Sequence, residues 1–223
     1  MRRLVLASGN PGKLREFREM LTPLGIEVIP QSELGVPEAD EPHGTFVENA
    51  LAKARLASRH TGMPAFADDS GICAEALGGE PGVHSARYAD ARRAQAQDGR
   101  AVQDRLNNEK LVAALQGQPN HRAHYYCVIV LLRHAADPEP LIAEGRWLGE
   151  VIAIPRGTGG FGYDPHFLLP KFGRTAAELL PEEKNAVSHR GRALTELVAR
   201  LREDAGFMIQ DSGVRDNRNS SRE

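Results

Sequence analysis

Apolar and polar residues follow two patterns along the chain, one typical of strands and one typical of helices. Continuous apolar runs predict strands at residues 3–7, 27–29, 64–67, 124–133 and 141–145, with Trp147 and 151–152 extending the last of them. Apolar residues at helical spacing predict helices at 14–24, 46–62 and 181–203, and one more through Leu106, Leu111 and Leu115. Gly25 and Gly62 are suitable stop signals for the first two helices.

The longest apolar run occupies residues 125–132 and is almost uninterrupted. Such a run predicts a strand in the middle of a sheet that is covered on both faces. Two prolines at 138–140 predict a turn, so the strand at 141–145 is expected to return beside it as a hairpin. Capping boxes at 45–48 and 175–178 predict two helix starts.

Two segments do not fit either pattern. Residues 89–105 are rich in Ala, Gln, Arg and Asp, which predicts an exposed excursion with little core. The chain becomes polar and rich in Asn, Ser and Arg after Gly206, which predicts disorder. We therefore expect one domain over residues 1–205, followed by a polar tail at 206–223.

Composition narrows the classes of function. The chain has 223 residues, of which 41% are hydrophobic and 26% charged, as is ordinary for a globular protein. The net charge of −2 argues against a nucleic-acid partner. No apolar run is long enough for a membrane span or a signal peptide, so we expect a cytoplasmic protein. Cys73 and Cys127 are far apart among apolar neighbours, which favours buried free thiols over a disulfide.

An adjacent pair of acids, Asp68 and Asp69, follows the strand at 64–67 and precedes Ser70 and Gly71. Neighbouring carboxylates repel each other, and their burial is costly unless a cation compensates. A hard metal ion such as Mg²⁺ would do so, since it takes oxygen ligands. Because side chains alternate along a strand, one acid can face a site while the other faces away. A solvated acidic turn is the alternative interpretation.

The first strand ends in a glycine-containing loop, Ser8-Gly9-Asn10-Pro11-Gly12-Lys13, and a helix follows. This order presents backbone N–H groups and a helix N-terminus to an anion. It is not the nucleotide-binding P-loop, because only two residues separate Gly9 from Gly12 and Leu14 follows Lys13. An ordinary strand-to-helix turn remains the alternative.

Residues 157–165 contain a second glycine-rich segment, with the spacing G-x-G-x-x-G at Gly157, Gly159 and Gly162. A dinucleotide-binding fingerprint would open a helix, but residues 164–169 show no helical period, so we reject that interpretation. The glycines instead favour a backbone that lies against a flat ligand, with Phe161 or Tyr163 stacking on it. A turn that contributes two aromatic residues to the core is the alternative.

Six segments together resemble the inosine/xanthosine triphosphate pyrophosphatases, a family that removes non-canonical purine nucleotides. They are LASGNPGK at 6–13, TFVENA at 45–50 with Lys53-Ala54, ADDSG at 67–71, LGGEPGVHSARY at 77–88, GTGGFGYDP at 157–165 and EKNAVSHRG at 183–191. They occur in the family's order and span residues 4 to about 202. The excursion near 90–100 and the tail depart from the family pattern, and so does the spacing between Glu41 and Thr45.

The resemblance implies a fold, a reaction and a set of site residues. The fold would be α/β, a mixed central sheet with helices on both faces and two lobes around a cleft, usually as a homodimer. The reaction would be Mg²⁺-dependent hydrolysis of ITP, dITP or XTP to the monophosphate and pyrophosphate. Asp69 would be the catalytic base and a metal ligand, with Glu41 and Asp68 as further metal ligands. The implied substrate-binding residues are Ser8, Gly9, Asn10, Lys13, Lys53, Ser70, Phe161, Gly162, Tyr163, Asp164, Lys184, His189 and Arg190.

Base selection is a further hypothesis. Phe161 would stack on the purine, while Lys184, His189 and Arg190 surround its edge. Hypoxanthine and xanthine carry a 6-oxo acceptor, whereas adenine carries a 6-amino donor, so Arg190 donors at position 6 would favour the former. Two alternative functions stay open: a related pyrophosphatase for modified pyrimidine or methylated nucleotides, and a non-catalytic nucleotide-binding regulator.

Overall fold

The structure is a computed structural model, which describes residues 2–89 and 99–203. The described strands form one mixed seven-stranded sheet in the order β2-β1-β3-β4-β5-β6-β7. Its strands are β1 (Arg2–Leu6), β2 (Ile26–Pro30), β3 (Ala65–Ala74), β4 (Arg122–Leu132), β5 (Leu141–Val151), β6 (Phe167–Leu169) and β7 (Arg174–Thr175). The helices are α1 (Pro11–Leu21), α2 (Phe46–Thr61), α3 (Gly99–Leu115), α4 (Pro181–Val187) and α5 (His189–Glu203).

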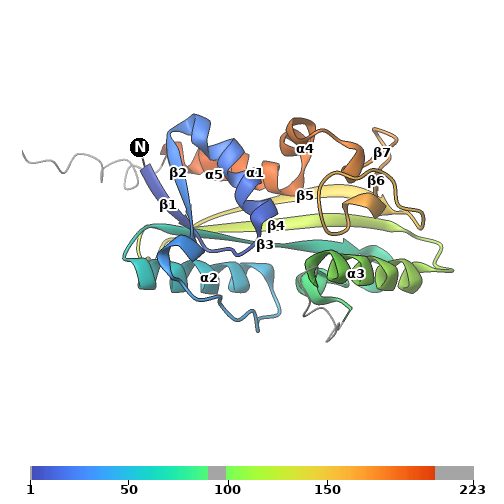
Figure 1. Ribbon diagram of the computed structural model, residues 1–223, viewed down its shortest axis with the longest axis horizontal. Helices are drawn as coiled ribbons and strands as arrows, with labels where there is room; N and C mark the ends of the chain where they lie inside the picture. The colour runs from blue at the N-terminus through green and yellow to red at the C-terminus, as the bar shows by residue number, and fades with distance from the viewer. Residues whose placement is uncertain (1, 90–98, 204–223) are drawn as a thin grey trace, which may run out of the picture.

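Helices lie on both sides of the sheet, as expected (Figure 1). Phe17 of α1 and Leu194 and Leu197 of α5 pack on Leu6 and Ile129 from one side. The alanine stripe of α2 packs on β1, β3 and β4 from the other side. A third cluster lies at the far end of the long strands, where Leu111 and Leu115 of α3 meet Ile72, Trp147 and Phe167.

The position of β4 between β3 and β5 confirms the strand that was predicted in the middle of the sheet. β4 pairs antiparallel with β3 along ten residues and with β5 along its other edge. Residues 127–132 are buried, because helices cover both faces there. Cys73 and Cys127 are both free thiols, as predicted, but only Cys127 is buried, whereas Cys73 is partly exposed.

β3 is much longer than predicted, and this decides where the acid pair lies. The strand continues to Ala74, so Asp68 and Asp69 lie within it and not in a turn after it. β1 pairs with β3 only at Ala65 and Phe66, because β1 ends at Leu6. From Asp68 to Ile72 no strand pairs with the β1-side edge of β3, and pairing resumes at an isolated bridge between Cys73 and Pro81. Side chains from both faces of β3 can reach the same cleft along this open stretch.

Four of the predicted helix features differ in the structure. The helix expected at 181–203 is two helices separated at Ser188, whose extended backbone (ψ 164°) ends α4. α3 begins at Gly99, inside the segment interpreted as an excursion, and α1 begins at Pro11, so Gly12 and Lys13 belong to its first turn. The capping box at Thr175 opens only a 3₁₀ turn. The rest of the excursion, residues 90–98, and the tail lie outside the described residues.

A cleft along the free edge of β3

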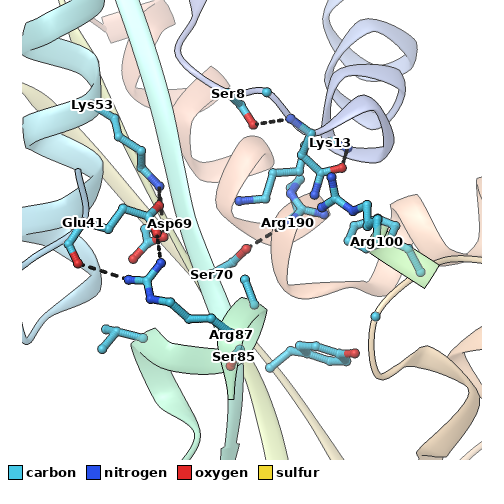
Figure 2. A pocket seen from close by; sticks show the side chains of 18 of the residues that line it. Ser8, Lys13, Glu41, Lys53, Asp69, Ser70, Ser85, Arg87, Arg100 and Arg190 are labelled. Carbon is cyan, nitrogen blue, oxygen red and sulfur yellow. Dashed lines mark hydrogen bonds and ion pairs between the residues drawn. The ribbon is translucent and has the colours of Figure 1, made fainter. Parts of the chain in front are cut away.

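A cleft of about 540 Å³ lies along the unpaired edge of β3. It is lined by fourteen of the predicted substrate and catalytic residues and by Glu41: Ser8, Gly9, Asn10, Lys13, Glu41, Lys53, Asp69, Ser70, Phe161, Gly162, Tyr163, Asp164, Lys184, His189 and Arg190. Asp68 is the predicted residue that does not line it. The segments responsible are distant in sequence and come together around β3 (Figure 2).

On one face of β3, Asp69 belongs to a carboxylate–ammonium cluster. Lys53 Nζ lies 3.0 Å from Asp69 Oδ1 and 2.8 Å from Glu41 Oε1, so one ammonium joins the two acids. Arg87 Nη1 lies 2.8 Å from the other oxygen of Glu41. Asn49, on the same helix as Lys53, donates to Asp69 Oδ2 at 3.4 Å. The two carboxylates thus share the ammonium of Lys53 at the cleft wall.

The protonation of this cluster follows from burial and charge. Burial raises the pKa of Asp69, and Lys53 offsets only part of that rise. Burial also acts on Glu41, but Lys53 and Arg87 outweigh it and lower the pKa of that carboxyl. Burial would lower the pKa of Lys53, yet Asp69 and Glu41 raise it, so this amine carries a proton.

Two carboxylates are a donor set that suits a hard divalent cation. Mg²⁺ is commonly held by one or two carboxylates, with waters and substrate phosphates completing its shell. Among residues 2–89 and 99–203, no cluster of three or more His, Cys, Asp or Glu side chains could hold a metal by itself. Glu41 and Asp69 would therefore supply only part of the ligand shell of such an ion.

On the opposite face of β3, Asp68 is buried beneath two cations. Its Oδ2 lies 2.9 Å from Lys13 Nζ and 3.2 Å from Arg190 Nη2, and it accepts from the hydroxyl of Ser70 at 3.2 Å. Burial opposes its ionisation, but Lys13 and Arg190 outweigh burial and hold its pKa well below the usual range. The predicted alternation of the acid pair is confirmed, because the two carboxylates face opposite sides.

The first turn of α1 is less open to an anion than the sequence suggested. Asn10 Oδ1 accepts hydrogen bonds from the N–H groups of Gly12 (2.9 Å) and Lys13 (3.3 Å). Ser8 Oγ accepts from Asn10 N–H at 3.2 Å, and Pro11 has no N–H group. Those amides are already satisfied, so the ammonium of Lys13, 14% exposed, is the main attraction for an anion here.

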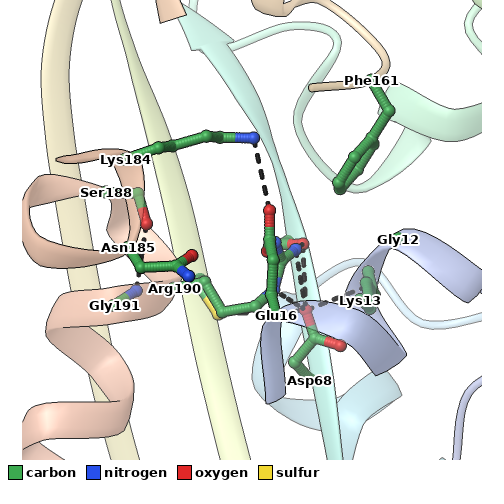
Figure 3. Close-up of polar contacts among 12 residues, drawn as sticks. Gly12, Lys13, Glu16, Asp68, Phe161, Lys184, Asn185, Ser188, Arg190 and Gly191 are labelled. Atoms are coloured by element: carbon green, nitrogen blue, oxygen red, sulfur yellow. Dashed lines mark hydrogen bonds and ion pairs between the residues drawn. The ribbon is translucent and has the colours of Figure 1, made fainter. Parts of the chain in front are cut away.

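A second charge cluster lies at the α4–α5 junction (Figure 3). Lys184 Nζ contacts Asp164 Oδ2 at 2.7 Å and Glu16 Oε1 at 3.3 Å, and it lies 4.9 Å from the centre of the Phe161 ring. Arg190 is 2% exposed and donates to Glu16, Asp68 and Ser70. Its guanidinium is thus already bound by carboxylates at the inner wall of the cleft.

His189 is an uncharged wall of the cleft. It is 5% exposed and stacks on Tyr125, with ring centres 4.6 Å apart and planes 9° apart. Burial, with the charges of Arg190 and Lys184, lowers its pKa well below the ordinary value. Its imidazole is therefore neutral at pH 7.

Sequence reasoning missed several polar residues of the site. Arg87 was within a recognised segment, LGGEPGVHSARY, yet received no role. Glu16, Asp104 and Asn108 lie beside other polar residues on helices, a pattern that ordinarily indicates a solvated face. Their contacts depend on tertiary structure, and no local signal reveals them. The other charged residues that line the cleft are Glu38, Asp40 and Arg100.

Comparison with known proteins identifies the family to which the chain belongs. A model of the Ham1 family matches residues 4–200. The chain belongs to the Ham1 family. A HAM1 protein from Coxiella burnetii has a similar structure, with a TM-score of 0.81 and 48% sequence identity, over 92% of this chain and all of that one.

Two curated relatives of this Ham1-family chain are named dITP/XTP pyrophosphatase. The one from Ralstonia nicotianae is 65% identical, over 91% of this chain and 98% of its own length. The one from Nitrosomonas europaea is 63% identical, over 92% of this chain and 96% of its own length. Among the described residues of this chain, no helix has the length and apolar content to cross a membrane.

Proposed function

We propose that this protein hydrolyses the non-canonical purine triphosphates ITP, dITP and XTP to the monophosphate and pyrophosphate. The observation that carries the proposal is one cleft that brings together the cations Lys13 and Lys53, the carboxylates Glu41 and Asp69, and the ring of Phe161. Relatives more than 60% identical over nearly their whole length are named for this activity. The resemblance noted from the six sequence segments points to the same reaction.

The triphosphate binds along the open edge of β3, where side chains from both faces of the strand reach it. Lys13 and Lys53 face the cleft from opposite sides of the strand and supply positive charge to the phosphate oxygens. Ser8, Asn10 and Ser70 add small polar groups along the same wall. Both lysines are paired with carboxylates, which confines them to the positions where phosphate oxygens arrive.

We propose magnesium as the metal, held by Glu41 and Asp69, the two carboxylates that flank the ammonium of Lys53. When bound, magnesium neutralises phosphate charge and increases the acidity of water. Asp69 then accepts the proton of the water that attacks the α-phosphorus, and pyrophosphate leaves as the α–β bridge breaks. Asp68, beneath Lys13 and Arg190, orients those two cations and does not contact the metal.

The base lies toward Phe161, with Lys184, His189 and Arg190 around it. Phe161 supplies a stacking surface, and the glycines of its loop allow the backbone to approach a flat ring. Arg190 recognises the 6-oxo group with N–H groups whose direction Glu16 and Asp68 fix.

We also propose that the protein acts in the cytoplasm as a homodimer. Light scattering measures this oligomeric state directly.

Replacing Asp69 by Asn tests the catalytic role. The amide keeps the shape of the side chain but is a poor proton acceptor and a weaker metal ligand. We expect kcat for ITP to fall by at least about 100-fold, which is the usual contribution of a positioned base, with a smaller change in affinity for the product IMP. Glu48→Gln is the matched control, because Glu48 lies on α2 outside the cleft. Near-normal kcat in Asp69→Asn would refute the role.

Turnover of a nucleotide panel separates the proposed function from its alternatives. We expect magnesium-dependent pyrophosphate release with ITP, dITP and XTP, and much less with ATP. Preference for a modified pyrimidine or methylated nucleotide would indicate the related pyrophosphatase. No pyrophosphate release with any triphosphate would indicate a nucleotide-binding regulator.

A further inference from the structure

Helix α3 holds the loop that carries Phe161 through two hydrogen bonds to one residue. The N–H of Gly162 donates to Asp104 Oδ2 at 3.1 Å, and the carbonyl oxygen of Gly162 accepts from Asn108 Nδ2 at 2.9 Å. Asp104 and Asn108 are one helical turn apart, so their side chains lie on the same face of α3. The two contacts span 54 and 58 residues of sequence.

These two bonds fix the peptide groups on both sides of Gly162. The bonded N–H belongs to the peptide group shared with Phe161, and the bonded carbonyl belongs to the group shared with Tyr163. Gly162 has a φ of +63°, and a glycine without restraints could adopt many other conformations. Fixing both groups therefore sets the direction in which the Phe161 ring leaves the loop.

The neighbouring residue of α3 holds the opposite lip of the cleft. Asn107 is 1% exposed, and its Nδ2 donates to the carbonyl oxygens of Ser85 (3.2 Å) and Ala86 (3.1 Å). Tyr163, beside Gly162, donates from its hydroxyl to the same Ser85 oxygen at 2.7 Å. α3 thus connects the glycine-rich loop with the segment that leads to Arg87.

A purely structural role does not explain Asn108. Its side chain is buried, and its Oδ1 has no hydrogen-bond partner among the described residues. Burying a half-satisfied amide is less favourable than burying an apolar side chain of similar size. The amide orientation is nevertheless fixed, because Nδ2 donates to the carbonyl oxygens of both Asp104 and Gly162. The donor toward Gly162 is what an apolar residue could not supply.

We propose that Asp104 and Asn108 are positioning residues that hold the base-contacting loop in its binding conformation. This inference rests on the proposed function, since it takes the purine to lie against Phe161. Neither side chain is placed to touch the phosphates, so both act on the strength and selectivity of base binding. The rate of phosphate bond cleavage depends on Asp69 and the lysines and is set separately.

The test compares ligands with and without a base. Asn108→Leu keeps the buried volume but removes the donor, and Asp104→Ala removes the acceptor. We expect each to raise KM for ITP and Kd for IMP by about threefold to tenfold, the usual effect of losing one hydrogen bond, while kcat changes less than twofold. Kd for inorganic tripolyphosphate should stay at the wild-type value.

Two further variants complete the experiment. Asp104→Asn should restore most of the IMP affinity that Asp104→Ala loses, because an amide oxygen can also accept from Gly162 N–H. Glu109→Ala is the matched control on α3, since Glu109 is exposed and pairs only with Arg105 in the described structure. Thermal unfolding identifies any variant that fails to fold, and Asp104→Asn remains informative in that case.

The outcomes are distinct. Unchanged IMP affinity in both Asn108→Leu and Asp104→Ala, or equal weakening of IMP and tripolyphosphate, would overturn the inference. Loss of kcat with unchanged KM would also overturn it, since that would place these residues with the chemistry. If the wild-type protein does not hydrolyse ITP at all, the proposed function itself fails, and that result is independent of the variants.

Discussion

Arg190 is a buried structural residue to which the proposed function also assigns base selection. It is the largest of the fully buried side chains, and its N–H groups go to Glu16, Asp68 and Ser70. Truncation to Ala would leave Glu16 with Lys184 and Asp68 with Lys13 as their remaining cations, so both carboxylates would lose part of the positive charge that offsets their burial. Loss of stability would then obscure any effect on selectivity.

Arg190→Lys is therefore the sharper test of base selection. A lysine keeps the charge but lacks the planar fork, so it cannot bridge Asp68 and Glu16 and also donate to Ser70. We expect the kcat/KM ratio of ITP to ATP to fall at least about tenfold, measured by pyrophosphate release. Arg200→Lys, exposed on the same helix, is the control. An unchanged ITP/ATP ratio in Arg190→Lys would exclude Arg190 from base selection.

At the residue scale, the sequence indicates which residues meet far better than how they pair. Lys13, Lys53, Asp69 and Arg190 were expected in one site, and all of them line one cleft. Their individual roles stay predictions. Glu16 went unnoticed, since an acid on an amphipathic helix ordinarily faces solvent, and only the folded chain brings Lys184 and Arg190 to it.

The break between α4 and α5 is the element-scale feature that sets the relative positions of Lys184 and Arg190. Ser188 ends α4 with an extended backbone, and its hydroxyl accepts from Gly191 N–H at 3.1 Å to cap α5. A side chain at Gly191 would place its Cβ 1.8 Å from the carbonyl oxygen of Asn185. The two helices can approach this closely only because residue 191 is glycine.

We expect Gly191→Ala to force α4 away from α5 and to displace Lys184 relative to Arg190. Because the clash is with backbone, both stability and base-dependent affinity should fall: unfolding in urea should show a loss of about 1 to 3 kcal/mol, and KM for ITP should rise. Ala193→Gly, two residues further along α5, is a control for helix propensity. Wild-type KM in Gly191→Ala would show that the helix junction does not aim these residues.

The β4–β5 turn depends on one buried carboxylate. Asp137 is 1% exposed and accepts from Arg133 N–H (2.9 Å), Arg133 Nε (2.8 Å) and Glu139 N–H (3.0 Å). The bonds from Arg133 hold the pKa of Asp137 well below its ordinary value of 3.8. A carboxyl whose folded pKa is depressed adds stability above the unfolded pKa, and this stability is lost as the pH falls toward the folded pKa.

Asp137→Asn should accordingly destabilise the protein by about 1.5 to 3 kcal/mol at pH 7, the usual strength of hydrogen bonds to a charged group. The difference from wild type should shrink as the pH falls below 3.8. Urea unfolding at pH 7, 4 and 3 measures it, with Glu139→Gln as an exposed control in the same turn. A difference that is constant with pH would mean that the charge of Asp137 does not support the turn.

Periodicity located most elements but not all their ends. The helix at 181–203 looked continuous because Val187 and Leu194 keep helical spacing across the break, and a serine within such a pattern is a weak signal. The length of β3 was underestimated because its acids and Ser70 interrupt the apolar run. In both places the sequence departs from simple patterning where residues of the cleft are located.

At the scale of the whole molecule, the cleft exists because two neighbouring strands differ in length. β1 pairs with only the first two residues of β3, and the cleft lies along the stretch from Asp69 to Gly71 that follows, before the bridge at Cys73. Strand order and register are long-range properties, so no local pattern could show that both faces of β3 contribute to one site. The resemblance to a known family supplied only the expectation that these residues lie around one cleft.

This architecture predicts how ligands should stabilise the fold. The phosphates of a complete nucleotide would contact α1 and α2. Its base would contact α5 and the loop around Phe161, which α3 holds in place. The nucleotide would therefore join segments from both sides of the cleft. An ITP analogue with a methylene bridge between the α and β phosphorus, at about 100 times its Kd with Mg²⁺, should stabilise the protein by about 2.7 kcal/mol. For a chain of this size that corresponds to a rise in Tm of about 5 to 10 °C. Tripolyphosphate or inosine at the same molar concentration should each give less, because each reaches one side only. If tripolyphosphate alone matched the analogue, the base side of the cleft would contribute nothing to binding, and the division of labour between the two ends of the cleft would have to be abandoned.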